Sequence, residues 1–204
     1  MTLTMYERIG HEGRRPSPFS WRIRCALAHK GLEPQFRHVR FSDVETIRAL
    51  SGQHFVPIIT DGDRVIHDSW NIACYLEERF PDRPSLRGRF RLLPRCRGPR
   101  LLPPFARGRL RLHARRILRR SAALACRIRR CNLTARKDTG EQPCVSGATP
   151  GYADYIVFSI FQYARLGCAD EFLGDGTALR RWRDGLVQAF DGLGDRYPGY
   201  PAHF

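Results

Sequence analysis

Residues 55–76, FVPIITDGDRVIHDSWNIACYL, decide the fold. Residues 55–60 and 64–66 are rich in β-branched side chains, and the turn at 61–63 contains a glycine, so we expect a β-hairpin there. A helix is expected after Asp68 and Ser69 and through Phe80, because apolar side chains recur on one of its faces and a proline follows it. This stretch therefore predicts a hairpin that leads directly into a helix.

Upstream of the hairpin, strand and helix patterns alternate. Residues 2–8 alternate apolar and polar side chains and predict a first strand. Ser17 suits an N-cap and Pro18 the first helical position, so a helix is expected to begin there. Residues 35–40 predict a second strand and 44–50 a weak helical turn. The order β-α-β-α-β-β-α is that of a thioredoxin-like α/β domain.

Downstream of residue 138 the pattern is helical. Two apolar stripes at helical spacing predict two buried helix faces: Ala153, Ile156, Val157, Ile160, Phe161 and Ala164 in one, and Leu179, Trp182, Leu186, Phe190 and Leu193 in the other. Asp154 suits the third position of a capping box, but Gly151 stands where Ser, Thr or Asn is expected. We therefore expect a thioredoxin-like domain followed by an all-α C-terminal domain that is incomplete.

The positive charge of the chain is concentrated in one segment. The 204 residues carry 35 Lys+Arg against 20 Asp+Glu, a net charge of +15. Residues 87–137 hold 17 Arg, one Lys and no acidic side chain. Residues 1–86 hold 12 basic and 11 acidic side chains, and 138–204 hold 5 and 9. The chain thus divides into domain 1–86, an Arg-rich segment 87–137, which we expect to be disordered, and the helical remnant 138–204.

Three interpretations of the Arg-rich segment compete. It is a basic arm for nucleic acid, a disordered linker, or a stretch translated in the wrong reading frame. Stacking aromatic residues are scarce, with only Phe90 and Phe105, which disfavours nucleic acid. A GC-rich gene read out of frame yields mainly Arg, Pro, Leu, Gly, Ala and Cys, and the chain holds 33 Arg against 2 Lys. We favour the frame error, which reading the coding DNA in all three frames would test.

Several classes of protein are disfavoured. No apolar run approaches the roughly 18 residues of a membrane span, and the N-terminus lacks a signal-peptide layout. The 7 Cys form no CxxC pair, which indicates a reducing cytoplasm. No metal site is expected, because the histidines show no metal-ligand spacing.

Three stretches carry a resemblance to a known family: SPFSWR at 17–22, ALAHKGL at 26–32 and DSWNIACYLEE at 68–78. They resemble the N-terminal domain of glutathione S-transferases, in the bacterial branch that includes aryl-ether-cleaving β-etherases. The resemblance skips the Arg-rich segment and resumes over 141–155 and at FDGLG, 190–194. It implies glutathione as co-substrate, a homodimer, and attack of the glutathione thiolate on a small apolar electrophile such as an aryl ether.

The resemblance also implies a catalytic residue. Ser17 matches the hydroxyl that contacts the thiol of glutathione, at a helix N-terminus whose dipole favours an anion. From spacing alone, a plain N-cap is the favoured explanation of Ser17, and the resemblance is what favours the thiol-contacting role. Ser20, one turn further on, is the substitute candidate.

Two further pairs match glutathione-binding motifs of the family. Val56 and Pro57 match a Val-Pro pair whose cis-proline exposes backbone groups to the cysteinyl unit, although an edge-strand proline would give the same sequence. Asp68 and Ser69 match the acidic-Ser pair that holds the γ-glutamyl group, with Ser69 capping the helix. A helix-capping pair without a ligand explains Asp68 and Ser69 almost as well.

The glycyl carboxylate has no clearly matched cation, and Arg40 and His54 are the candidates. Family members use the two helices after residue 86 for the second-substrate wall and for dimer contacts. Prolines in the first half of the Arg-rich segment oppose long helices there. We therefore expect a formed N-terminal domain, weak or absent catalysis, and aggregation. The alternatives are a nucleic-acid-binding protein and a catalytically inactive homologue.

Overall fold

The computed structural model describes residues 3–88, 143–166, 171, 173 and 175–199. Its elements are β1 (Leu3–Arg8), η1 (His11–Gly13), α1 (Pro18–His29), β2 (Gln35–Val39), α2 (Val44–Ser51), β3 (Ile58–Asp61), β4 (Arg64–His67), α3 (Ser69–Arg79), α5 (Tyr152–Ala164) and α6 (Ala178–Gly192). The prediction of disorder for 87–137 falls almost wholly outside the described residues.

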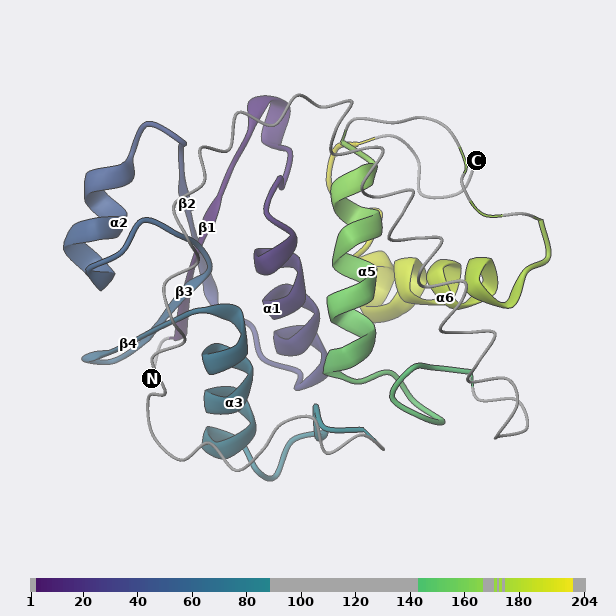
Figure 1. Ribbon diagram of the computed structural model, residues 1–204. Coiled ribbons are helices and arrows are strands. Elements are labelled where there is room, and N and C mark those ends of the chain that lie inside the picture. The colour runs from purple at the N-terminus through teal and green to yellow at the C-terminus, as the bar shows by residue number, and fades with distance from the viewer. Residues whose placement is uncertain (1–2, 89–142, 167–170, 172, 174, 200–204) are drawn as a thin grey trace, which may run out of the picture.

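The α/β part has the predicted element order. Its sheet runs β2-β1-β3-β4, with β1 parallel to β2 and β3 antiparallel to both β1 and β4. Helix α2 lies on one side of the sheet and α1 and α3 on the other, while α5 lies beside α1 and α6 beyond it (Figure 1). The architecture is a thioredoxin-like α/β part followed by a helical part, as the sequence predicted.

The strand register brings three connections to the same end of the sheet. Tyr6 near the end of β1 pairs with Ile58 at the start of β3, and Ile58 pairs with His67 at the end of β4. The loop after β1, the segment before β3 and the start of α3 therefore leave the sheet together. These connections carry the predicted site residues.

Pro57 lies before a central strand rather than in an edge strand. Strand β3 is flanked by β1 and β4, and the Val56–Pro57 peptide bond is cis. Of the two possibilities that the sequence left open, the structure has the special bend. The weak helical turn expected at 44–50 is a full helix, α2, which buries Ile47.

The two faces of the sheet are buried by different helices. Met5 and Ile59 belong to a core shared with α1 and α3, whereas Ile58 and Val39 pack with Ile47 of α2. Adjacent strand residues such as 58 and 59 point to opposite faces, so one strand supplies both cores. The larger core continues beyond α1 into the helical part.

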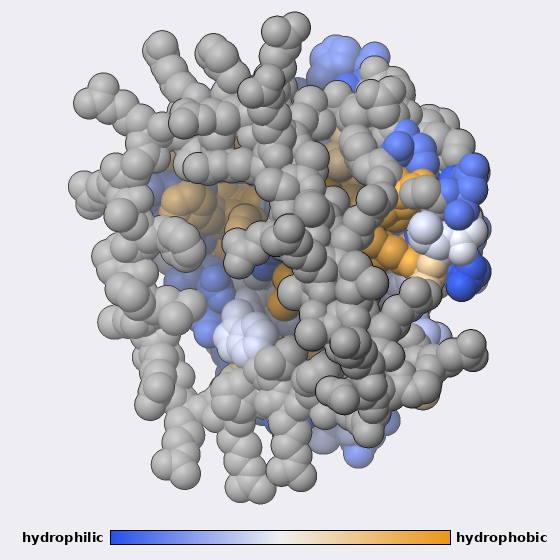
Figure 2. All heavy atoms as spheres, turned by 45° about the vertical axis from the view of Figure 1, so that its right-hand side comes forward, coloured by the Kyte–Doolittle hydropathy of each residue, from blue (hydrophilic) through white to orange (hydrophobic). Residues whose placement is uncertain are grey.

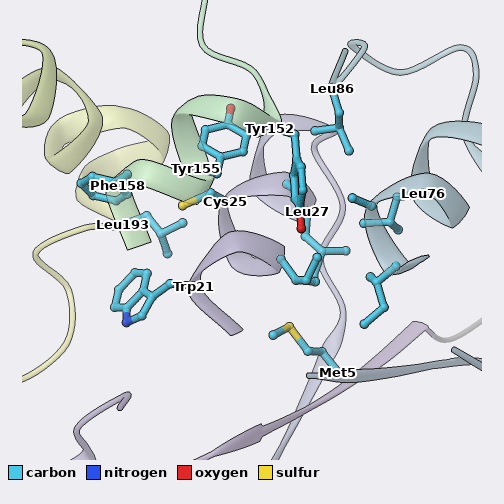
Figure 3. Close-up of a cluster of buried hydrophobic side chains, with 14 of the residues drawn as sticks. Met5, Trp21, Cys25, Leu27, Leu76, Leu86, Tyr152, Tyr155, Phe158 and Leu193 are labelled. Atoms are coloured by element: carbon cyan, nitrogen blue, oxygen red, sulfur yellow. The ribbon is translucent and has the colours of Figure 1, made fainter. Parts of the chain in front are cut away.

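Helix α1 is buried on both of its long sides. Figure 3 shows Leu27 toward Met5 and the sheet, and Cys25 beside Tyr155 of α5. Trp21, also on α1, belongs to the same core and is 2% exposed. The helix that begins at Ser17 is therefore the element that joins the two parts.

One of the two stripes predicted for the helical part is wrong. The buried side chains of α5 are Tyr152, Asp154, Tyr155, Phe158, Ser159 and Gln162, whereas Ile156, Val157 and Ile160 are only half-buried. Polar groups on this face have partners across the interface: the Tyr152 hydroxyl donates to the Ser69 carbonyl at 2.7 Å. Of the stripe predicted over 179–193, Leu186 is buried within α6 and Leu193 is buried just after the helix. Its other members, Leu179, Trp182 and Phe190, are half-buried.

Asp154 caps α5 although Gly151 supplies no side-chain cap. Its carboxylate accepts hydrogen bonds from the backbone N–H of Gly151 (3.0 Å), Val145 (2.8 Å) and Ser146 (3.0 Å), and from the Trp182 indole (2.8 Å). A Cβ at position 151 would lie 2.7 Å from the Ser146 Oγ. Close packing of the turn therefore explains the glycine.

Large hydrophobic side chains at the surface are mostly in the α/β part: Phe19, Phe36, Phe41, Phe55, Val65 and Val145. The rings of Phe19, Phe36 and Phe41 each lie under an arginine guanidinium. Figure 2 shows hydrophobic residues at the surface next to hydrophilic ones. Within the described ranges, no helix has the length and apolarity to cross a membrane.

Candidate functional site

Ser17 lies at the N-terminus of α1, where the chain turns from extended to helical. Its backbone is extended (φ −89°, ψ 111°), and its Oγ accepts a hydrogen bond from the Ser20 N–H at 3.1 Å. Pro18 takes the first helical position, and no acidic residue occupies the first turn. The positive end of the helix dipole is thus not neutralised locally, which favours an anion here by about 1 kcal/mol.

Ser20 differs from Ser17 in its surroundings. It is 2% exposed, and its Oγ has no hydrogen-bond partner among the described atoms. Ser17 is only half-buried, so its hydroxyl is the one of the two with access to a ligand. Of the two candidates, Ser17 suits contact with a thiol and Ser20 does not.

Val56 and Pro57 lie at the same end of the sheet. Val56 is half-buried and stands two residues before the first ladder pair of β3, Ile58 with Tyr6. Its backbone polar groups therefore lie outside the β3 ladder. Pro57 is buried and supplies no N–H. The cis bond therefore places Val56 just before the start of β3.

Asp68, not Ser69, is the N-cap of α3. The Asp68 Oδ1 accepts hydrogen bonds from the N–H groups of Trp70 (2.9 Å) and Asn71 (3.2 Å). Asp68 has φ +70°, a conformation that costs a non-glycine residue free energy and is often found at ligand sites. Ser69 is the first helical residue and is buried. The prediction that Ser69 caps the helix is therefore wrong, because the longer aspartate side chain reaches the free N–H groups.

Nothing in the sequence indicated a role for Arg8, yet this residue joins the loops that carry Arg40 and His54. Its guanidinium donates to the carbonyl of Arg40 and to that of His54, the latter at 3.3 Å. The side chains of Arg40 and His54 are both exposed. The two candidate cations thus stand on neighbouring loops that one buried arginine holds together.

Arg22 is a second residue that sequence reasoning missed. Its guanidinium carbon lies 4.5 Å from the centroid of the Phe19 ring, and its Nε donates to the Ser159 Oγ at 3.3 Å. Burial lowers the pKa of Arg22, while Tyr152 and Asp68 act in the opposite sense. A positive charge therefore lies between the beginnings of α1 and α3 and the helix α5.

The N-termini of α1 and α3 lie at one end of the sheet. The bent segment Val56–Pro57 leads into β3 at the same end, because β3 pairs with both β1 and β4. Helix N-termini bind anions through free N–H groups, so the site suits a ligand that carries a thiolate and a carboxylate. In the described part of the chain, no cluster of His, Cys, Asp or Glu could hold a metal ion. The architecture is therefore a thioredoxin-like α/β part followed by a helical part, with a candidate anion site at one end of the sheet.

Comparison with known proteins finds a similarity to glutathione S-transferases in the N-terminal part of the chain. Residues 16–79 match the family model of the glutathione S-transferase N-terminal domain. The chain is similar to glutathione S-transferase 1 of Dianthus caryophyllus (39% identity over 74 residues, 34% of each chain). It is also similar to glutathione S-transferase Z1 of Arabidopsis thaliana (39% over 72 residues, 32% of this chain and 31% of the relative). The match spans about a third of the length of these relatives.

Solved structures show the same fold over most of the chain. A dehydroascorbate reductase of Chlamydomonas reinhardtii aligns with a TM-score of 0.63 at 20% identity, covering 92% of this chain and 89% of the other. A rice glutathione S-transferase in complex with glutathione aligns with a TM-score of 0.58 at 19% identity, covering 97% and 91%. These structures show a shared fold, and the similarity of residues 16–79 to glutathione S-transferases does not favour the nucleic-acid-binding alternative.

Proposed function

We propose that this protein binds glutathione as co-substrate and transfers it, through its thiolate, to an apolar electrophile. The observation that carries the proposal is the register of Tyr6, Ile58 and His67, which gathers the three matched motifs at one end of the sheet. The family match over residues 16–79 contains all of these motifs.

Ser17 is the catalytic residue in this proposal. A free thiol has a pKa of about 8.5, so at neutral pH only a small fraction of glutathione is ionised. The dipole of α1 and a hydrogen bond from the Ser17 hydroxyl both favour the thiolate, and each unit by which they lower the thiol pKa corresponds to about 1.4 kcal/mol. The Ser17 hydroxyl can keep its capping role, because it accepts from the Ser20 N–H and still has its own proton to donate to the thiolate.

The remaining groups hold the peptide of glutathione. Backbone groups of Val56, presented by the bend at Pro57, pair with the cysteinyl unit. Asp68 and Ser69 hold the γ-glutamyl end at the start of α3, where the positive end of the helix dipole favours its carboxylate. Arg40 or His54 serves as the cation for the glycyl carboxylate.

The more specific parts of this proposal rest on the resemblance. An aryl ether is the proposed electrophile, the protein is a cytoplasmic homodimer, and the domains are 1–86 and 138–204 with the Arg-rich segment between them. A frame error in 87–137 would remove the second-substrate wall, so we expect glutathione binding to survive better than turnover. Glutathione binding without turnover would also be expected of a catalytically inactive homologue, which is the alternative to the proposed function.

Two variants at one position test the role of Ser17. Ser17→Ala removes the hydroxyl and the helix cap, whereas Ser17→Asn keeps a good cap and replaces the hydroxyl by a larger carboxamide. We expect Ser17→Asn to fold like the wild type and to return the thiol pKa of bound glutathione toward its free value, measured by thiolate absorbance against pH. Ser42→Ala, in an exposed loop, is the matched control.

The outcomes separate the hypotheses. Retention of the wild type on immobilised glutathione, with a lowered thiol pKa that Ser17→Asn abolishes, supports the proposal. Binding with an unshifted thiol pKa in the wild type identifies an inactive homologue. Failure of the folded wild type to bind glutathione refutes the proposed function.

A further inference from the structure

A carboxylate is fully buried beside the loop that leads to Ser17. Glu7 on β1 is 0% exposed, and the Arg24 Nε donates to its Oε2 at 2.6 Å, while a second guanidinium nitrogen of Arg24 reaches its Oε1. The Arg15 Nε lies 3.0 Å and the His38 Nε2 3.2 Å from the Glu7 Oε1. One carboxylate thus faces two guanidinium groups and an imidazole.

This cluster buries more positive than negative charge. Arg15 is 8% exposed and Arg24 is 3% exposed, so neither guanidinium is well solvated. Glu7 can neutralise only one of them, and a buried charge without compensation is strongly unfavourable. Further acceptors must therefore face the two arginines.

Tyr197 supplies part of that compensation, beside the Phe36 ring on Arg24 and the Gly13 carbonyl on Arg15. Among the described residues, Tyr197 is the only group from outside the α/β part that contacts both guanidinium groups. Its ring centroid lies 4.7 Å from the guanidinium carbon of Arg15 and 4.4 Å from that of Arg24, within the range of cation–π contacts. Its hydroxyl accepts a hydrogen bond from the Arg24 Nη1 at 2.5 Å. Tyr197 belongs to the segment after α6, so the end of the helical part reaches back to the first strand of the α/β part.

The same contacts fix the loop between β1 and α1. The Trp21 Nε1 donates to the Arg15 carbonyl at 3.0 Å, and the Trp21 ring packs edge-on against Tyr197 at 5.8 Å. The Arg15 guanidinium donates to the Gly13 carbonyl within the loop. Arg15 stands two residues before Ser17, so its placement sets where the chain enters α1.

We propose that Tyr197 is a positioning residue for Ser17. It holds Arg15 and Arg24 between its ring and Glu7, and thereby fixes the loop whose end presents the Ser17 hydroxyl. This inference rests on the proposed function for its effect on glutathione, but the placement of Ser17 can be measured without any ligand.

The ligand-free test follows one amide proton. The Ser20 N–H donates to the Ser17 Oγ, so its hydrogen exchange reports whether Ser17 is in place. Tyr197→Ala removes the ring, and we expect faster exchange at Ser20, by roughly five-fold, since a single partly buried cation–π contact corresponds to about that factor. Tyr197→Phe keeps the ring and loses only the hydroxyl, so it should retain most of the protection. Tyr163→Ala on α5 is the matched control for removal of a half-buried tyrosine.

The second measurement is the thiol pKa of bound glutathione. With wild-type binding established, we expect Tyr197→Ala to raise that pKa and Tyr197→Phe to restore it nearly to the wild-type value. A general loss of stability would not move the thiol pKa in the folded fraction, which separates positioning from a merely structural role.

The outcomes distinguish failure of the positioning role of Tyr197 from failure of the proposed function. An unchanged thiol pKa in Tyr197→Ala, with glutathione bound by the wild type, overturns the proposal. If the wild type does not bind glutathione, the proposed function fails, and Ser20 exchange alone decides the placement of Ser17: equal exchange in Tyr197→Ala and Tyr163→Ala overturns it, and faster exchange in Tyr197→Ala upholds it.

Discussion

Lys30 offers the sharpest test of how α1 is joined to α3 and to the segment that follows α3. Its side chain is 0% exposed, and its Nζ lies 3.0 Å from the Glu77 Oε2. The same ammonium donates to the carbonyls of Phe80 (3.2 Å) and Pro84 (3.1 Å). One cation at the end of α1 therefore holds both α3 and the segment that leaves it. Lys30→Met keeps the apolar stem and removes the charge.

The expected loss in the free energy of unfolding of Lys30→Met depends on how well Glu77 is compensated without the ammonium group. Removing one partner of a buried ion pair costs about 3–5 kcal/mol, since the other charge is stranded. Glu77 keeps hydrogen bonds from the Ser85 Oγ and the Leu86 N–H, so we expect the lower end, about 3 kcal/mol. With a urea m-value of about 2 kcal/mol/M, the unfolding midpoint should fall by roughly 1.5 M.

Urea unfolding followed by tryptophan fluorescence measures this change. Arg14→Met is the control, because the Arg14–Glu12 pair is exposed (42% and 58%) and should contribute no more than about 0.5 kcal/mol. Equal midpoint shifts in Lys30→Met and Arg14→Met would refute the reasoning.

The ion pair should also depend on pH. Burial raises the pKa of Glu77, but hydrogen bonds from Ser85, Leu86 and Lys30 outweigh it and leave the pKa below its ordinary value. A carboxyl with a lowered folded-state pKa stabilises the fold fully above its unfolded pKa, and the stabilisation is lost as pH falls through the folded value. The difference in the free energy of unfolding between the wild type and Lys30→Met should therefore become smaller as the pH is lowered.

Two further predictions concern α5 and its neighbours. Gly151→Ala should destabilise by about 1–3 kcal/mol in thermal unfolding, because the new Cβ meets the Ser146 Oγ at 2.7 Å and the Leu86 carbonyl at 3.0 Å. Ser146→Gly should relieve part of this cost, and no relief would contradict the steric cause. Burial is the main cause that lowers the pKa of His29 below 6.5, so its contribution to stability is present above pH 6.5 and lost as pH falls through the folded value. His29→Gln should flatten the stability profile in that acid range, and an unchanged profile would exclude His29 as the titrating group.

The elements of the α/β part were predictable because their signals are local. The hairpin turn closes at Asp61 paired with Arg64, as the glycine between the two strands indicated. Ser17 caps α1 through a bond to Ser20, only three residues away. Capping and turn formation depend on a few neighbouring side chains, so a single sequence is enough to find them.

The buried arginines were not predictable, because their partners are far away in the chain. Arg24 is buried only because Glu7 and Tyr197, 17 and 173 residues away, face it. Hydrophobic periodicity counts arginine as a surface residue. The same limit explains the error on α5, where Tyr155 and Ser159 are buried through hydrogen bonds to His29 and Arg22 that no periodicity records.

Helix α1 belongs both to the candidate site and to the junction between the two parts. Ser17 begins the helix, Cys25 and its neighbours pack against α5, and Lys30 at its end holds the segment after α3. A packed helix transmits a shift along its axis rather than bending, because its side chains are close-packed on both sides. Loss of the α1–α5 contact should therefore displace Ser17 even though the contact lies along the helix from it. Glutathione binding and the packing of the helical part should then be lost over the same range of denaturant, as expected when the site and the junction share one helix.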